Sequence, residues 1–330
     1  MINIGWIGCG RHASQMLLPQ LARCGIRIAA VCDVDAGAAE RTAAHYGVTR
    51  VVSDFHDLIA TPGLDAIGMA VGPDAHRAAS LAALSRGLPV FMEKPPALDL
   101  AGAKEIAEAS RAAQKPVYVG FMKRYATGNR IAKNVLEGDF GPVLGLNASY
   151  MTAPTYFAGE VDYSGFYLHH CVHYMDLVPW LGGGAITEMS ARTIEPEPGK
   201  ILFHLSVALA NGAIGTVQMG TVQSRGTPME FVQVMGDHKR LEIENVIHVA
   251  YYRDPPFKAD DPAATLADAA DTLSWTPNFT AAANEDFKGY HALMTAVAAG
   301  LKGEATDAPT IDDGVAAMAN LERMISVVGR

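Results

Sequence analysis

The sequence predicts an α/β protein of two domains: a doubly wound parallel sheet, then an α/β domain with an open, mainly antiparallel sheet. In residues 1–121, short apolar runs alternate with helical stretches, as in strand–helix–strand units. Beyond that point, strands follow one another through turn signals such as Asn211-Gly212. Because 330 residues are many for a single core, we divide the chain into residues 1–121 and 122–330.

Composition excludes several classes of function. The formal net charge of −9 argues against a nucleic-acid partner and against an anionic membrane surface. No stretch is apolar enough to span a bilayer, and the first strand has no basic segment before it, so we expect no signal peptide. The four cysteines form no CxxC pair and are expected as buried thiols, not as disulfides or zinc ligands. These features favour the cytoplasm.

The first strand leads directly into a glycine-rich turn. Ile2–Ile7 is mostly apolar, as in a strand buried on both faces. The hexapeptide GCGRHA follows and opens a helix at about residue 15, which is the G-x-G-x-x-G/A pattern in its required place. Gly8 permits the tight turn, and Gly10 lets the backbone approach a pyrophosphate. Arg11 and His12 lie where the helix start faces the phosphates. We therefore predict a Rossmann dinucleotide-binding domain.

An acidic residue ends the second strand, Ile28–Cys32. Asp33 lies about 20 residues past the glycines, where an acceptor for a ribose hydroxyl is expected. A carboxylate there accepts a hydrogen bond from the 2′-hydroxyl of NAD and repels the 2′-phosphate of NADP. Arg11 offsets part of that repulsion, so NAD is the predicted cofactor while NADP remains possible.

The alternation of strands and helices continues through the first domain. A helix over residues 38–46 and strands over 51–52 and 65–71 precede Gly72-Pro73, which opens the helix that ends at Arg86, with Asp74 as the expected N-cap. His76, on this helix, either faces the cofactor or packs in the core; we favour the cofactor. A helix over 100–113 and a strand over 117–121 complete the predicted sheet.

The stretch PVFMEKPP, residues 89–96, brings charged groups to the end of a buried strand. Pro95 biases Lys94 towards an extended conformation. A residue at the carboxyl end of a strand in an open α/β sheet points into the crevice where ligands bind. Glu93 and Lys94 are therefore predicted at the cofactor. The alternative is a solvated ion pair at a strand end.

The second domain is expected to be rich in strands. A helix over 129–138 comes first, and two amphipathic helices, over 285–301 and 311–328, close the chain. Between them the strands alternate apolar and polar residues, as in a sheet with one face on helices. They cover residues 143–151, 186–194, 201–210, 213–222, 230–235 and 240–244. The other face carries enough apolar and small residues to pack on a second subunit, and residues 254–283 are expected as a lid or an oligomer arm.

A histidine-rich helix is predicted over residues 165–181. In a regular helix, His169, His173 and Asp176 share one face, while His170 points elsewhere. Three interpretations remain open: a packed helix, a metal-binding histidine pair, and acid–base catalysis, which we favour. The usual glutamate base is missing between the histidines and no third ligand is evident, so no metal is predicted.

Taken together, GCGRHA, GPDAH at 72–76, EKP at 93–95, GFMKRY at 120–125 and HxxxHxxD at 169–176 resemble the glucose–fructose oxidoreductase and inositol dehydrogenase (Gfo/Idh/MocA) family over essentially the whole chain. The resemblance implies that Lys94 and His173 sit at the nicotinamide, beside a hydroxyl of a sugar or polyol. It also implies a homodimer or homotetramer built on the open sheet face. The sequence departs from the family at His169, where many members carry Asp, and at Met122-Lys123, which replaces a common Asn-Arg pair.

We therefore expect an NAD(P)-dependent dehydrogenase or ketosugar reductase acting on a sugar, cyclitol or sugar derivative. His173 is the expected base and Lys94 the group that stabilises negative charge on the substrate oxygen. Four further side chains are expected to bind the substrate: His169, Asp176, Lys123 and Arg124. An NAD-retaining hydrolase or lyase that uses transient oxidation is the first alternative. A non-catalytic dinucleotide sensor is the second, although a sensor needs neither Lys94 nor His173.

Overall fold

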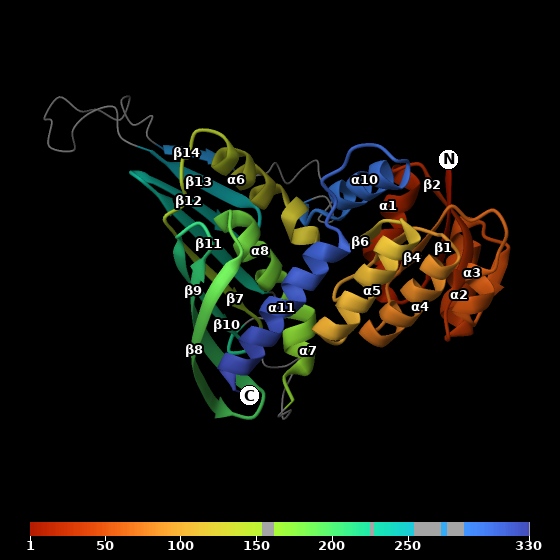
Figure 1. The fold of residues 1–330 in the computed structure, drawn as a ribbon, viewed down its shortest axis with the longest axis horizontal. Helices are drawn as coiled ribbons and strands as arrows, with labels where there is room; N and C mark the ends of the chain where they lie inside the picture. The colour runs from red at the N-terminus through yellow and green to blue at the C-terminus, as the bar shows by residue number, and fades with distance from the viewer. Residues whose placement is uncertain (154–161, 225–227, 254–271, 276–286, 330) are drawn as a thin grey trace, which may run out of the picture. The chain divides into compact units, whose positions relative to one another are not determined.

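A computed structural model describes residues 1–153, 162–224, 228–253, 272–275 and 287–329 (Figure 1). The chain forms two compact units. The first comprises Met1–Met122 and Gly289–Glu322, and the second comprises Lys123–Lys288 and Arg323–Arg330. The first unit thus takes in a segment from near the C-terminus. The assignment of residues 1–121 and 122–330 to cofactor and substrate functions stays a prediction.

The first unit is built on a parallel sheet of six strands in the order β3-β2-β1-β4-β5-β6. Every residue of β4 and β5 is buried, which explains their continuous apolar sequences. The strand order reverses between β1 and β4, and ligands bind in the crevice at such a reversal. This confirms the predicted doubly wound sheet. Its strands are β1 (Ile2–Ile7), β2 (Ile26–Cys32), β3 (Arg50–Val52), β4 (Ala66–Met69), β5 (Val90–Met92) and β6 (Val117–Val119).

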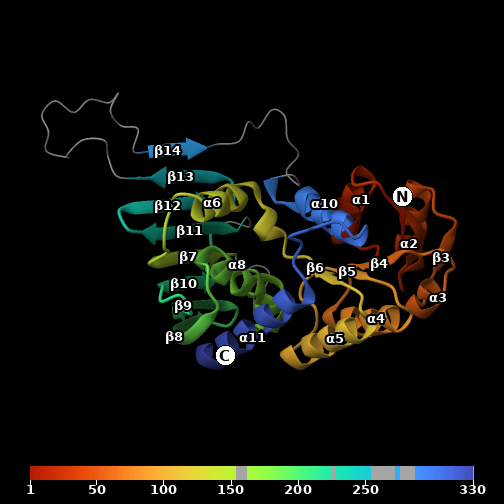
Figure 2. The same ribbon diagram turned by 45° about the horizontal axis from the view of Figure 1, so that its top comes forward.

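Helices cover both faces of this sheet. Helices α4 and α5 lie on one face, and α1 and α10 lie together on the other (Figure 2). A π-helical segment, η1, leads into α1. The expected N-cap at Asp74 is wrong: α4 starts at Pro73, whose fixed φ suits the first helical position, and Gly72 is the cap. The helices are η1 (Ala13–Leu17), α1 (Leu18–Arg23), α2 (Ala36–Tyr46), α3 (Phe55–Ile59), α4 (Pro73–Ser85), α5 (Leu100–Ala113) and α10 (Tyr290–Leu301).

The second unit contains a sheet of eight described strands in the order β14-β13-β12-β11-β7-β10-β9-β8. The pair β7–β10 is parallel, and the other described pairs are antiparallel, which confirms the mainly antiparallel sheet. Strands β13 and β14 were not expected. The strands are β7 (Gly145–Met151), β8 (Ile186–Glu197), β9 (Lys200–Leu209), β10 (Ile214–Gly220), β11 (Met229–Gly236), β12 (Lys239–Glu244), β13 (His248–Tyr252) and β14 (Thr272–Trp275). Apart from β14, the expected lid or arm at 254–283 lies outside the described residues.

Helices α6 and α8 lie on one face of the second sheet (Figures 1 and 2). The helix expected over 165–181 is confirmed, but it is not regular: a π-helical segment, η4, lies between α7 and α8. The remaining elements are η2 (Met122–Tyr125), α6 (Thr127–Glu137), α7 (Ser164–Phe166), η4 (Tyr167–Cys171), α8 (Val172–Gly182) and α11 (Ile311–Val328).

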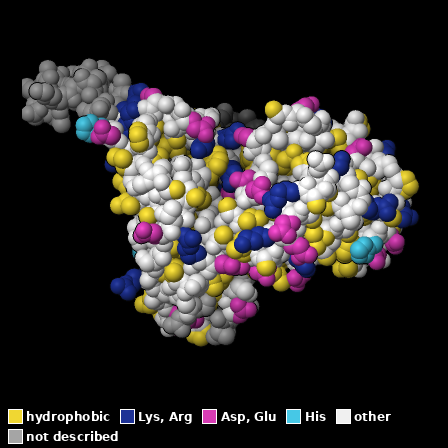
Figure 3. Space-filling model, viewed as in Figure 1, with side chains coloured by type: hydrophobic (Ala, Val, Ile, Leu, Met, Phe, Trp, Pro, Cys, Tyr) yellow, Lys and Arg dark blue, Asp and Glu magenta, His cyan; other side chains and the backbone are white. Residues whose placement is uncertain are grey.

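The face of this sheet away from α6 and α8 mixes apolar and polar side chains. Ile194, Ile214 and Met229 are 59%, 67% and 55% exposed. Between them, side chains hydrogen-bond from strand to strand along the row Thr216, Asn147, Gln233 and Glu242. In Figure 3, hydrophobic side chains over the second unit are scattered among polar ones.

Candidate functional site

The glycine turn after β1 has the geometry that a dinucleotide needs. Gly8 has φ +92°, and a Cβ there would lie 2.3 Å from the carbonyl oxygen of Ala70, so only glycine fits. At Gly10, no described atom lies within 4 Å of the position that a Cβ would take. Arg11 and His12 are exposed in the first helical turn, where backbone N–H groups have no partner within the helix. The turn therefore leaves room and donors for a pyrophosphate.

Asp33 follows β2, and its side chain forms a hydrogen bond with the backbone of the glycine turn. Its Oδ2 accepts a hydrogen bond from the Cys9 N–H at 2.6 Å, and its Oδ1 accepts from the Asp35 N–H at 2.9 Å. The side chain stays partly exposed. A carboxylate offers about four acceptor sites, so hydroxyls of a ribose can still bind. These residues fit NAD, and Asp33 has a second role that the sequence did not reveal: it fixes the glycine turn.

The carboxylate of Glu93 lies between the glycine turn and Lys94. It is 5% exposed, with Oε1 3.6 Å from His12 Nε2 and Oε2 accepting the Lys94 N–H at 3.2 Å. Gly120 makes room for it, since a Cβ there would lie 2.8 Å from Oε1. Burial alone would raise the pKa of Glu93, but His12 and the Lys94 ammonium outweigh burial and lower that pKa. Glu93 is therefore an ionised, buried anchor beside a half-buried Lys94.

The structure places His76 inside the first unit. Its side chain is fully buried and bonds to two backbone groups, the N–H of Val71 at 3.2 Å and the carbonyl oxygen of Pro95 at 2.9 Å. At the start of the same helix, Gly72 is exposed and Pro73 is half-buried. These two residues lie just beyond the carboxyl end of β4, at the edge of the sheet where the glycine turn also lies.

In the second unit, the two histidines of the predicted pair lie in different surroundings. His169 is exposed on η4, whereas His173 is 8% exposed on α8. The π-helical segment η4 has i→i+5 hydrogen bonds, which change the rotation per residue before Val172. The i,i+4 spacing of His169 and His173 therefore no longer places their rings one above the other. Among the described residues, no group of three or more His, Cys, Asp or Glu could hold a metal ion.

Asp176 and Arg124, both predicted to bind substrate, form a buried ion pair with each other. Arg124 donates from Nε to Asp176 Oδ2 at 2.9 Å and from Nη2 to Oδ1 at 2.5 Å. The Asp176 side chain is 1% exposed and that of Arg124 is 13% exposed. The two-point contact fixes η2 against α8.

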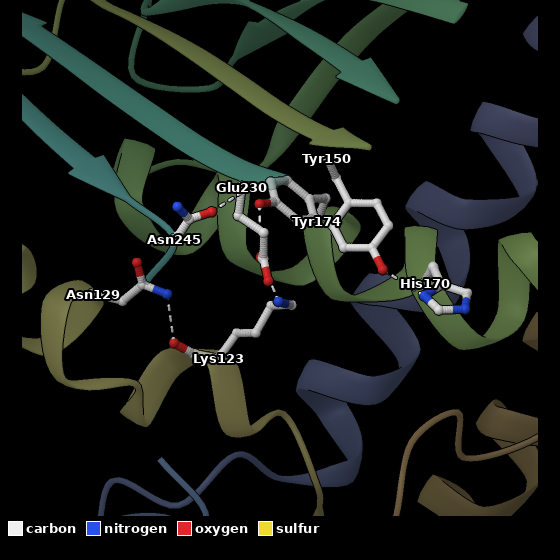
Figure 4. A network of polar contacts seen from close by, with 7 residues as sticks. All are labelled: Lys123, Asn129, Tyr150, His170, Tyr174, Glu230 and Asn245. Atoms are coloured by element: carbon white, nitrogen blue, oxygen red, sulfur yellow. Dashed lines mark hydrogen bonds and ion pairs between the residues drawn. The ribbon is translucent and has the colours of Figure 1, made fainter. Parts of the chain in front are cut away.

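Lys123 belongs to a second buried network (Figure 4). Its ammonium pairs with Glu230 and lies 5.7 and 5.8 Å from the ring centroids of Tyr150 and Tyr174. Tyr174 Oη donates to Glu230 Oε2 at 2.9 Å. Burial, together with the charge of Glu230, raises the pKa of Tyr174 well above its ordinary value. Tyr150 Oη lies 2.6 Å from His170 Nδ1.

Four members of this network were missed by sequence reasoning: Glu230, Tyr150, Tyr174 and His170. The sequence does carry a signal for Glu230. It alternates with Val232 and Val234 on the buried face of β11, where a carboxylate needs a partner. Tyr174 directly follows His173 on a helix that is buried nearly all round. Neither pattern names the partner.

The sequence matches a known family over most of its length. Residues 2–121 match the NAD-binding Rossmann fold of the Gfo/Idh/MocA oxidoreductase family, and residues 132–326 match its C-terminal α/β domain. The chain therefore belongs to this family of NAD-binding oxidoreductases. The match confirms the predicted family, the two folds and NAD as the cofactor.

Several relatives are similar over nearly the full chain. The inositol 2-dehydrogenase of Burkholderia vietnamiensis is 29% identical and that of Ralstonia nicotianae is 30% identical, each over 96% of this chain and 90% of the relative. Among solved structures, a dehydrogenase from Chromobacterium violaceum has a TM-score of 0.87 at 22% identity, covering 100% of this chain and 96% of that one. Levoglucosan dehydrogenase in complex with NADH and L-sorbose has a TM-score of 0.83 at 16% identity, with 99% and 96% covered. At these identities the structural likeness shows the fold.

No described helix is long and apolar enough to cross a membrane.

Proposed function

We propose that this protein is an NAD-dependent dehydrogenase or ketosugar reductase that acts on a hydroxyl or keto carbon of a sugar, cyclitol or sugar derivative. The observation that carries the proposal is the presentation of Lys94. It follows β5 at the carboxyl edge of the parallel sheet, with its amide held by Glu93, in the same unit as the glycine turn. Relatives named inositol 2-dehydrogenase support the substrate class.

Each chemical role goes to a residue suited to it. Bound NAD supplies the nicotinamide that accepts the hydride. His173 takes the hydroxyl proton, because imidazole exchanges a proton near neutral pH. Lys94 donates a hydrogen bond to the same oxygen and stabilises its developing negative charge. Gly8, Gly10, Asp33 and their neighbours hold the cofactor.

His169, Asp176, Lys123 and Arg124 are proposed to line the substrate. Both cations of this set already have a buried carboxylate partner, Lys123 in Glu230 and Arg124 in Asp176. An anionic substrate would have to compete with those partners. The pairing therefore favours a neutral, hydroxyl-rich substrate over a sugar acid or a sugar phosphate.

A spectrophotometric screen tests the proposal. NADH formation is followed with inositols and sugars, and NADH consumption with their keto forms. On the best substrate, Lys94→Ala and His173→Ala should each lower kcat by roughly 10² or more while leaving NAD affinity near that of the wild type. A folded variant with normal kcat would remove that residue from the mechanism. Product formation without net NADH would instead identify the NAD-retaining hydrolase or lyase.

We further propose a homodimer or homotetramer that pairs the open face of β8–β12 with a second copy. Exposed Ile194, Ile214 and Met229 around a hydrogen-bonded polar row support this, since a second copy covers both kinds of group. Light scattering should show an oligomer at micromolar concentration, and Ile214→Glu should dissociate it. A wild-type monomer would contradict this part.

The cysteines among the described residues are all free, which supports a reducing compartment such as the cytoplasm.

A further inference from the structure

The ring of His76 connects two backbone segments that carry the proposed chemistry. Its Nε2 lies 3.2 Å from the Val71 nitrogen, which is a donor, so Nε2 acts as the acceptor. The proton of the neutral ring is then on Nδ1, which donates to the Pro95 carbonyl oxygen at 2.9 Å. One tautomer of one side chain therefore bridges the loop after β4 and the loop after β5.

Each end of this bridge lies next to a functional group. The Val71 end abuts the glycine turn, because a Cβ on Gly8 would lie 2.7 Å from Val71 Cγ1. The Pro95 end is the carbonyl group of the residue that follows Lys94. On the other side of Lys94, Glu93 Oε2 accepts the Lys94 N–H. The Lys94 N–H and the carbonyl oxygen of the next residue, Pro95, are thus both hydrogen-bonded.

We propose that His76 is a positioning residue that fixes Lys94 relative to the glycine turn. The inference rests on the proposed role of Lys94 and replaces the expectation that His76 touches the cofactor, since its side chain has no exposed surface. A misplacement on the scale of 1 Å costs on the order of 10²-fold in rate. Loss of the bridge should therefore act on the chemical step more than on NAD binding.

Two substitutions separate positioning from simple packing. His76→Leu fills the site but has neither donor nor acceptor, whereas His76→Gln carries both an N–H donor and a carbonyl acceptor. Ser80→Ala is the matched control. Ser80 is also fully buried on α4, and its hydroxyl donates to the His76 carbonyl oxygen at 2.6 Å rather than to the loops.

The first readout is kinetic. His76→Leu should lower kcat by roughly 10²-fold with NAD affinity near that of the wild type, and His76→Gln should recover most of the loss. Ser80→Ala should keep kcat even where it lowers the melting temperature. A His76→Leu enzyme with wild-type kcat, or one whose loss is matched by Ser80→Ala, would overturn the inference.

The second readout does not depend on catalysis. Hydrogen exchange of the Val71 amide, and the rate at which acetic anhydride modifies Lys94, report the bridge directly. His76→Leu should raise the exchange rate of the Val71 amide and change the rate at which acetic anhydride modifies Lys94. Ser80→Ala should change neither rate. If Lys94→Ala keeps kcat, the proposed function of Lys94 fails, yet this readout still decides whether His76 positions it. Unchanged exchange and modification in His76→Leu would refute the positioning role.

Discussion

The buried pair of Lys123 and Glu230 allows a prediction of stability with a stated size. Their side chains are 7% and 14% exposed, and Tyr174 donates a hydrogen bond to the same carboxylate. Glu230→Gln keeps the shape of the side chain but leaves the Lys123 ammonium buried without a counter-charge. Removing one partner of a buried ion pair costs about 3–5 kcal/mol. Each kcal/mol lowers the melting temperature of a unit of this size by about 2–4 °C, so the shift should be about 6–20 °C.

Two further variants make the measurement specific. Lys123→Met combined with Glu230→Gln removes both charges and should recover much of the loss, because replacing a whole buried pair is often neutral. Asp312→Asn breaks the pair of Arg111 and Asp312, whose side chains are 63% and 75% exposed, and should cost no more than about 1 kcal/mol. Circular dichroism melts of all four proteins at neutral pH give the comparison. A Glu230→Gln melt equal to that of Asp312→Asn, or a double variant as unstable as the single one, would refute the reasoning.

Four other expectations concern titration, thiols and the cofactor. Asp33→Ala should narrow the preference for NAD over NADP in fluorescence titrations; tighter NADP binding by the wild type would oppose the role of Asp33. His169→Asn should remove one step from the pH–rate profile, and an unchanged profile and KM would show that His169 does not act on the substrate. The pKa of Glu93 is held below its ordinary value of 4.5, so its ionisation stabilises the fold above that pH, and this contribution is lost as the pH falls below it. In Glu93→Gln, the melting temperature should therefore fall less steeply as the pH is lowered through this range. Burial raises the pKa of Cys9 and of Cys32 to about 11, so at pH 8 both thiols should react with iodoacetamide only as slowly as the protein opens.

Local sequence determined the dinucleotide half of the site. Gly8 needs a left-handed backbone, Gly10 leaves open space, and Asp33 ends the next strand, all within one strand–turn–helix–strand unit. Such features can be predicted because they depend on backbone conformation and on hydrophobic periodicity over a few residues. For the same reason α5 has the bounds that its sequence indicates, with Asp99 accepting the Gly102 N–H at its start.

Tertiary structure decided which charged and polar side chains meet. Lys123 and Glu230 are 107 residues apart, Arg124 and Asp176 are 52 apart, and His76 and Pro95 are 19 apart. These pairings depend on strand register and on which helix face is buried, and no local period encodes either. The π-helical segment between α7 and α8 was likewise not predicted, because such turns are rare inside α-helices and no local pattern in this sequence indicates one. The sequence alone therefore determined the fold class and the cofactor, and the tertiary structure decided that His76 bonds to both Val71 and Pro95 and that Lys123 and Arg124 each have a buried carboxylate partner.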